Sequence, residues 1–350
     1  MELKTLIREY KPALIQKYGD TLLPSQWRAL QSIERCRTAK SGELFVQCKQ
    51  CAHAHCLPLS CGHRHCPTCQ NHEVNQWLDR QKQKLLPVEY FMVTFTLPAQ
   101  LRALTWAKQK AIYRLFFACV VSTLKDFGLN PDKLDGDTGF TAVLHTHNRR
   151  LDYHPHIHVV MPGGGINQKR RQWKKLKGKF LFNEFALAKV FRARFLGALN
   201  NEAIAIPQNT PKKWVANVQH VGKGLPALTY LSRYLYRGVI SEKNIVENKN
   251  GKVTFRYTNS STKKTEYRTF SGEDFLALIL KHVLPRGFRR VRDYGFLHAN
   301  AKALLKRVQL ILNVKLEITP LRARAEFICP LCQSTMVIRI IKHAERLVPD

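Results

Sequence analysis

Acidic residues are scarce in this chain of 350 residues. The sequence has 25 Asp and Glu against 57 Lys and Arg, which gives a formal net charge of +32. So large an excess of one sign repels itself and indicates a polyanionic partner, either nucleic acid or an anionic membrane. The basic residues are spread over the whole chain and do not gather on one amphipathic helix. That distribution favours nucleic acid.

Several sequence features that would indicate other classes are absent. No apolar run is long enough for a transmembrane helix, and the charged N-terminus, Met1 to Arg8, does not resemble a secretory signal. We therefore expect a cytoplasmic, reducing location and no membrane partner. There is no internal repeat, no low-complexity tract and no Gly-Lys-Ser/Thr loop of an ATPase. Any unwinding of DNA is therefore expected to come from another protein.

In a reducing location, the 10 cysteines indicate metal ligands rather than disulfides. Cys48-Lys-Gln-Cys51 and Cys66-Pro-Thr-Cys69 are two Cys-x-x-Cys knuckles with 14 residues between them. This spacing predicts one tetrahedral zinc site with the four thiolates as ligands. Four thiolates leave no open position, so the zinc would be structural and would supply folding energy to a segment with little core.

Further candidate ligands remain after that site is filled. Cys36, Cys61 and His65 are our first choices for a second zinc, completed by His63 or Cys56. The alternative is that some of these histidines contact phosphate. Cys119 lies in an apolar run and is expected in the core.

A third knuckle, Cys329-Pro-Leu-Cys332, supplies only two ligands. It completes a site with the unassigned N-terminal ligands, completes one with His343, or is an incomplete remnant.

The apolar periodicity predicts an α+β fold. Residues 90–97 are typical of a buried strand, 98–127 of a long helix and 139–147 of a second strand, after which the strand of His156 returns antiparallel. This order predicts an open antiparallel sheet with helices packed on it. We expect three parts: an N-terminal helical and zinc-binding domain, a catalytic domain with a basic C-terminal extension, and a tail with the third knuckle. They cover residues 1–86, 87–318 and 319–350.

Residues 169–179, directly after the His156 strand, are rich in Lys and Arg. We expect a phosphate-binding loop there, with DNA contacts from Arg170, Arg171, Lys174 and Lys175; a solvated loop is the alternative.

His156-Ile157-His158 indicates a metal centre. Side chains alternate along a strand, so the two imidazoles share one face and supply two-thirds of a divalent metal site. His145 is our first choice for the third ligand, because the turn folds its strand beside that of His156 and cross-strand Cβ atoms lie about 5 Å apart. The competing candidates are His154, Asp152, Gln219 and His220.

Tyr230 and Tyr234 lie one turn apart on a helix expected over residues 225–238. A phenol with a pKa of about 10 attacks poorly, and a nearby cation helps it to react as phenolate. Attack on DNA would give a 5′-phosphotyrosine bond and a free 3′-OH. Arg233 and Arg237 are close enough to bind phosphate. A Tyr/Leu core stripe is the alternative.

With these residues the chain resembles the two-tyrosine rolling-circle transposases of bacterial insertion sequences, which belong to the HUH endonuclease superfamily. The matching segments extend from residue 36 to 234, and the basic C-terminal part is also similar. They are Cys36-Arg-Thr, Ser60-Cys-Gly-His-Arg-His-Cys-Pro-Thr-Cys69, Phe95-Thr-Leu-Pro98, Leu144-His-Thr146, His154-Pro-His-Ile-His158, Pro162-Gly-Gly-Gly165 and Tyr230-Leu-Ser-Arg-Tyr234.

The resemblance implies an N-terminal zinc-binding domain and a catalytic HUH domain with an antiparallel palm sheet. It implies nicking and joining of single-stranded DNA at transposon ends and target site with Mg²⁺ or Mn²⁺, in the bacterial cytoplasm at the nucleoid. His156 and His158 would be metal ligands, and Tyr230 and Tyr234 nucleophiles. A host helicase or the replication machinery would be a further partner.

Two rival functions are a replication-initiator or relaxase-type nickase and a zinc-finger DNA-binding regulator without activity. The cysteine-rich segment and the missing ATPase loop favour a transposase over the first. The second does not account for His156, His158, Tyr230 and Tyr234 together.

Overall fold

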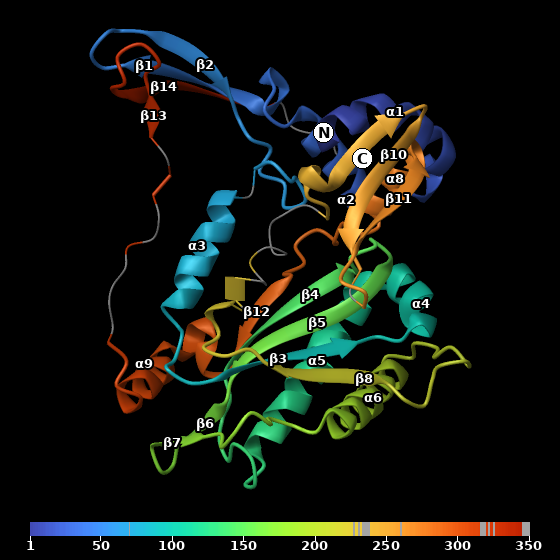
Figure 1. Cartoon of the computed structure of the whole chain (residues 1–350), viewed down its shortest axis with the longest axis vertical. Coiled ribbons are helices and arrows are strands. Elements are labelled where there is room, and N and C mark those ends of the chain that lie inside the picture. Colours follow the sequence, from blue (N-terminus) through green and yellow to red (C-terminus); the bar gives the residue numbers. More distant parts are fainter. Residues whose placement is uncertain are drawn as a thin grey trace.

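The structure is a computed structural model, shown in Figure 1. The residues it describes are 1–69, 71–226, 228, 229, 232, 239–259, 261–315, 320, 323, 324 and 326–344.

A five-stranded antiparallel sheet lies at the centre of the molecule, with strand order β12-β4-β5-β3-β8. Its strands are β3 (Tyr90–Thr96), β4 (Phe140–His147), β5 (Tyr153–Pro162), β8 (Val215–His220) and β12 (Val291–Tyr294). The expected strands at 90–97 and 139–147 and the antiparallel return after them are present. The predicted α+β class is therefore confirmed.

One face of this sheet is apolar and is covered by helices. Phe91, Val93 and Phe95 of β3, with Ile157 and Val159 of β5, belong to the largest buried cluster. Their alternate spacing puts them on one side of the pleat, where helices pack against them. These helices are α5 (Gln109–Leu129) and α6 (Glu184–Asn201).

The helix expected over residues 98–127 is interrupted. The backbone at Lys108 has φ −124° and ψ 42°, outside the helical region. The segment is therefore divided into a 3₁₀ turn, a short helix and α5. They are η3 (Ala99–Leu101), α4 (Arg102–Ala107) and α5.

The opposite face of the sheet is polar at its centre and apolar at one end. At the apolar end, Val143 and Val160 pack with Trp77 of α3 (Asn71–Lys82) and Val308 of α9 (Lys302–Ile311). Two 3₁₀ turns precede α9, η5 (Gly295–Leu297) and η6 (Ala299–Ala301). The polar centre carries the histidines described below.

The N-terminal helices α1 (Leu3–Tyr18) and α2 (Pro24–Arg35) pack with the later helix α8 (Gly272–Leu280). One buried cluster joins Leu6 and Leu14 of α1 to Phe255 and Phe275. A three-stranded sheet completes this part, with β9 (Ile245–Lys249), β10 (Lys252–Thr258) and β11 (Thr265–Ser271). Packing thus crosses the boundary expected at residue 86, although the boundaries themselves stay predictions.

Two segments far apart in the sequence, residues 42–58 and 327–343, form a separate four-stranded sheet of order β13-β14-β1-β2, at the upper left of Figure 1. Its strands are β1 (Gly42–Cys48), β2 (Ala54–Pro58), β13 (Phe327–Ile328) and β14 (Thr335–His343). The expected tail at 319–350 therefore pairs, in its described part, with the N-terminal strand β1.

The remaining elements are short. The basic segment after β5 forms a hairpin of β6 (Gly164–Asn167) and β7 (Gln172–Lys175). The other 3₁₀ turns are η1 (Gly19–Thr21), η2 (Ala39–Ser41) and η4 (Glu242–Asn244). Among the described helices, none combines the length and the hydropathy needed to cross a membrane.

Candidate functional site

Three histidines meet on the polar face of the central sheet. His145 of β4 lies directly opposite His156 of β5, and His158 lies two residues further along the same strand. One ring nitrogen from each lies within 4.8 Å of the others. We call His145, His156 and His158 the histidine centre. The structure thus brings His145 to the expected pair, while its role as third ligand stays a prediction.

A β-bulge beside the centre shapes this part of the sheet. The register between β4 and β5 shifts between His145 and His147, so that β5 has one residue more than β4 there. Pro155 lies at this shift, where a proline costs no ladder hydrogen bond. Bulges redirect side chains, and this one lies directly next to the His145–His156 pair.

Hydrogen bonds orient the imidazoles of His156 and His158. His156 Nδ1 lies 2.7 Å from the carbonyl oxygen of His154, to which it can only donate. Its proton is thereby fixed on Nδ1, and Nε2 keeps the lone pair that a metal requires. His158 Nδ1 lies 2.9 Å from the hydroxyl oxygen of Thr94 on β3.

Thr94 was not among the residues predicted from the sequence. A signal for it exists, because Thr94 lies between Val93 and Phe95, which belong to the apolar face of β3. Strand alternation therefore puts Thr94 on the polar face, and the register of β3 with β5 places it opposite His158.

Burial keeps the centre uncharged at neutral pH. Loss of solvation lowers the pKa of His156 to about 4 and that of His158 to about 3. It also holds the pKa of His145 well below its ordinary value, with the neighbouring histidines adding to the effect. All three imidazoles are therefore neutral at pH 7, which is the form that binds metal.

The competing ligand candidates have other partners. His154 Nδ1 lies 2.9 Å from an Arg102 guanidinium nitrogen, and Asp152 pairs with Arg268 at 2.8 Å. His220 lies 2.7 Å from the Glu89 carboxylate. Gln219 lies on β8 opposite Met92, with β3 between its strand and β5.

The donor set fits a divalent cation. Three neutral imidazoles converge, and the group contains no carboxylate among the described residues. Imidazole suits first-row transition ions better than Mg²⁺, which prefers oxygen ligands. Of the two ions expected, Mn²⁺ therefore fits these residues better than Mg²⁺.

Tyr230, Tyr234, Arg233 and Arg237 lie outside the described residues. The described part of their segment, residues 225, 226, 228, 229 and 232, is helical. Leu228 is buried with Tyr90 and Val160, which places it on the histidine-bearing face of the sheet. The turn before it closes on Tyr90: at Gly224 (φ +81°) an added Cβ would lie 2.6 Å from that ring.

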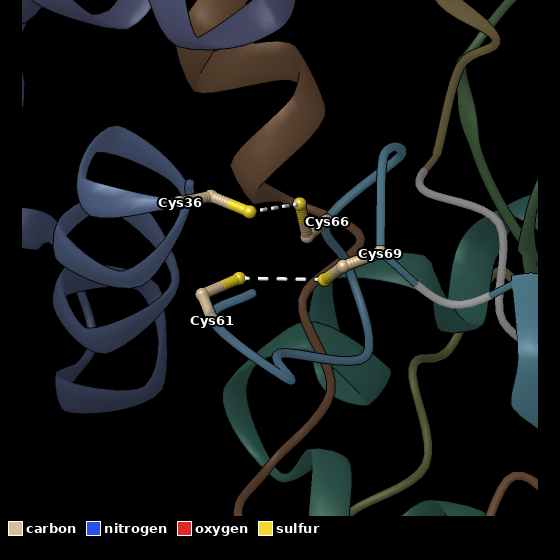
Figure 2. A group of neighbouring side chains, drawn as sticks. All are labelled: Cys36, Cys61, Cys66 and Cys69. Atoms are coloured by element: carbon tan, nitrogen blue, oxygen red, sulfur yellow. Dashed lines mark hydrogen bonds between the residues drawn. The ribbon is translucent and has the colours of Figure 1, made fainter. Parts of the chain in front are cut away.

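Four cysteines converge beside the N-terminal helices (Figure 2). Cys36 follows α2, and the loop after β2 supplies Cys61, Cys66 and Cys69. The Sγ atoms of Cys36 and Cys66 lie 3.6 Å apart, as do those of Cys61 and Cys69. We call these residues the proximal cysteine group. Cys36 and Cys66 are fully buried in the core shared by α1, α2 and α8.

A second set lies in the four-stranded sheet β13-β14-β1-β2. Cys48 and Cys51 meet Cys329 and Cys332, with all four Sγ atoms within 4.8 Å of one another. We call these residues the distal cysteine group.

The cysteines are thus grouped differently from the sequence-based interpretation, which joined the knuckle 48–51 to the knuckle 66–69. Cys48 lies at the tip of the β1–β2 hairpin, whereas Cys36 lies near its base. A strand of this length separates tip from base by roughly 20 Å. The two N-terminal knuckles are therefore carried to opposite ends of the hairpin.

The other proposed zinc ligands belong to neither group. His65 is buried, and its Nε2 accepts a hydrogen bond from the Leu284 backbone at 3.3 Å. Cys56 is exposed on β2, and His63 is not part of either group. Cys119 is buried in the core as expected, where burial raises the pKa of its thiol to about 11.

Two basic surfaces flank the sheet. In the β6–β7 hairpin, Arg170, Arg171, Lys174 and Lys175 are exposed, and Lys174 lies 3.6 Å from Asp135. The other surface is a cavity of about 710 Å³ between α5 and the loop before β12. Its lining comprises Lys110, Ala111, Arg114, Arg286, Gly287, Phe288, Arg289 and Arg292. Five of these eight residues are cationic and none is acidic.

A basic α+β protein with cysteine-rich modules and a histidine centre on an antiparallel sheet has the features of a metalloprotein that acts on nucleic acid. Comparison with known proteins supports this class of protein. Residues 139–303 match the family described as putative transposase, and residues 6–97 match the transposase zinc-binding domain of the IS91 type.

Two relatives extend this likeness. The chain is 34% identical to the putative transposase y4qJ of Sinorhizobium fredii, over 85% of this chain and 80% of the relative. It is 27% identical to the transposase for insertion sequence element IS801 of Pseudomonas savastanoi pv. phaseolicola, over 75% of this chain and 68% of the relative. No solved structure matches the chain. The chain belongs to the IS91-type family of insertion-sequence transposases, and DNA is its partner.

Proposed function

We propose that this transposase nicks and rejoins single-stranded DNA at the ends of its insertion sequence through a 5′-phosphotyrosine intermediate. The observation that carries the proposal is the histidine centre, three neutral imidazoles on the polar face of the sheet. The described start of the tyrosine segment supports it, because Leu228 packs on that same face.

The histidines of the centre would hold Mn²⁺ or Mg²⁺. When bound, such an ion polarises the scissile phosphate and offsets the charge that develops on it. The chain's own contribution is orientation. The His154 carbonyl fixes the proton of His156, and the Thr94 hydroxyl holds the ring of His158.

Tyr230 and Tyr234 are the proposed nucleophiles. The phenol oxygen of one of them attacks phosphorus, the bond from phosphorus to the 3′ oxygen breaks, and the 3′ oxygen leaves and takes up a proton. The phenol gives up its proton, so charge and protons balance. One phosphoester bond replaces another, which conserves the energy for rejoining.

The proximal cysteine group is the proposed binding site of a structural zinc ion. Its donor set is four thiolates, with Cys36 and Cys66 buried in the helical core. Such a set closes the coordination sphere and leaves no position for chemistry.

The two basic surfaces are the proposed contacts to the DNA backbone. The exposed side chains of the β6–β7 hairpin follow directly from β5, the strand of His156 and His158. The cavity beside α5 offers a concentration of positive charge, because five cationic side chains and no acidic one line it. A positively charged groove of this kind follows the phosphate backbone of a single strand.

Incubation of the protein with labelled single-stranded DNA and Mn²⁺ tests the proposed function. We expect a covalent protein–DNA adduct that survives denaturation and carries a free 3′-OH. Tyr230→Phe and Tyr234→Phe identify the attacking residue, and the double variant should form no adduct. If the wild type forms none with any end sequence of the element, the nicking mechanism is wrong and the zinc-finger regulator becomes the better interpretation.

DNA affinity should fall steeply with salt, because Lys and Arg contacts to phosphate release counterions. For six contacts to a single strand, a rise from 50 to 200 mM salt should weaken binding by about 300-fold. Arg286→Ala with Arg289→Ala should reduce the logarithmic salt slope by about 1.4. Lys243→Ala with Lys249→Ala is the charge-matched control, because both lysines are exposed and neither lines the cavity. Equal slopes for the two double variants would exclude the cavity as a DNA contact.

A further inference from the structure

One sheet joins residues 42–58 to residues 327–343, two segments far apart in the sequence. β14 pairs with the whole length of β1 (Figure 1). The paired residues run from Gly42 opposite His343 to Cys48 opposite Met336. This register places the third knuckle beside the turn between β1 and β2. His343, one candidate partner for that knuckle, lies at the opposite end of β14.

The thiols at this end of the sheet have the spacing of a metal site. The Sγ atoms of Cys48 and Cys332 lie 3.4 Å apart, and those of Cys51 and Cys329 lie 3.6 Å apart. A tetrahedron with Zn–S bonds of about 2.3 Å has sulfur atoms roughly 3.8 Å apart. The backbone N–H of Gln50 donates a hydrogen bond to the Cys48 sulfur at 3.4 Å.

The two knuckles also share one backbone form. In each, the first cysteine's N–H donates to the carbonyl five residues later, Cys48 to His53 at 2.7 Å and Cys329 to Ser334 at 2.8 Å. In each, the residue after the second cysteine has a positive φ, 58° at Ala52 and 60° at Gln333. Left-handed backbone is uncommon for such residues. Its repetition in two segments far apart in the sequence indicates a common requirement, the presentation of two thiolates to one ion.

Apolar packing alone does not account for this sheet. Its buried cluster consists of Val46, Cys48, Cys329 and Met336. Other apolar side chains of β14 are exposed, Ile340 at 61% and Ile341 at 49%. A sheet with so small a core requires another source of stability, such as a structural metal.

We propose that the distal cysteine group binds its own Zn²⁺, which fastens the C-terminal hairpin β13–β14 to the N-terminal hairpin β1–β2. Cys329 and Cys332 lie outside both segments matched to known families, residues 6–97 and 139–303. This zinc site is therefore built from the zinc-binding domain and a segment beyond the catalytic one. It is separate from the proximal group, because the two groups share no ligand.

The two ions should differ in lability. Cys51 of the distal group is exposed, whereas Cys36 and Cys66 of the proximal group are buried among helices. A chelator reaches the distal ion more readily. Its removal frees β13–β14, which the described contacts attach mainly to β1.

Zinc content of the purified full-length chain tests the proposal. We expect two zinc ions per chain in the wild type and half that content in Cys329→Ser with Cys332→Ser. Cys56→Ser, an exposed cysteine in the same sheet, should retain both ions. Full zinc content in the double variant, or one ion in the wild type, would overturn the proposal.

Hydrogen exchange during chelation of the wild type gives a second measurement that needs no variant. The first zinc released should be accompanied by loss of protection in residues 42–58 and 327–343, while α1 and α2 stay protected. Simultaneous loss of both ions and of all protection would contradict two separate sites.

Discussion

His156→Ala and His158→Ala should each slow the proposed Mn²⁺-dependent nicking of DNA by at least about 100-fold. Loss of a metal ligand should cost more than the roughly 10–100-fold that follows when only the hydrogen-bond partner of a ligand is changed. Each substitution leaves two imidazoles, too few to hold a divalent ion in position. The fold should survive, since the apolar face of the sheet and its helices are unchanged. Nicking rates, Mn²⁺ titration by calorimetry and circular dichroism measure the three effects.

Thr94→Val should reduce Mn²⁺ affinity and nicking as well, but by less than the histidine substitutions. The substitution removes the hydroxyl that lies 2.9 Å from His158 Nδ1 and nearly preserves the side-chain volume. We expect Mn²⁺ affinity to fall by about tenfold, with nicking restored by higher Mn²⁺.

His220→Ala is the matched control, since it removes a histidine from the same sheet that is paired with Glu89 instead. Its nicking rate should stay within about twofold of wild type. A loss equal to that of His158→Ala would mean that the histidine centre has been assigned to the wrong residues.

The histidine pair was predictable because its signal is local. Strand alternation fixes the shared face of His156 and His158, and the short turn at residues 148–152 brings His145 beside them. The bulge at Pro155 was not predictable in the same way, because register depends on how two strands pair. The contact of Thr94 with His158 likewise requires that β3 lie beside β5. The sequence does not show which strands of a sheet are neighbours when they are far apart in the chain.

The cysteines show where local spacing fails. A Cys-x-x-Cys knuckle predicts two ligands but does not say which other pair completes the site. Here the choice follows from the β1–β2 hairpin, which holds Cys48 and Cys51 away from Cys66 and next to the C-terminal knuckle. Neither knuckle sequence predicts that β1 pairs with β14, because these strands are far apart in the chain. The common core of α1 and α8 is equally remote in sequence and crosses an expected domain boundary.

The core that α1 and α2 share with α8 and β10 leads to the second prediction with a large expected effect, which concerns Cys66. Cys66→Ser should remove one zinc ion and unfold more than the N-terminal segment. A structural zinc contributes about 10–16 kcal/mol in small zinc-binding domains, and whole domains are stable by about 5–15 kcal/mol. Cys66 is fully buried beside Cys36 in the cluster that also contains Phe255 and Phe275. Loss of the ion therefore exposes the core of α8 and β10 as well as that of α1 and α2.

Hydrogen exchange locates this unfolding. Protection should disappear in residues 3–35 and 245–283 and remain in β3 and β5, whose apolar face packs on α5 and α6 instead. Cys119→Ser is the control, a buried cysteine whose burial raises its pKa to about 11 and which belongs to neither cysteine group. It should keep full zinc content and lose only modest stability. If Cys66→Ser keeps its zinc, or if protection is lost in residues 3–35 alone, then the proximal ion does not stabilise the shared core, and α8 with β9–β11 must fold without it.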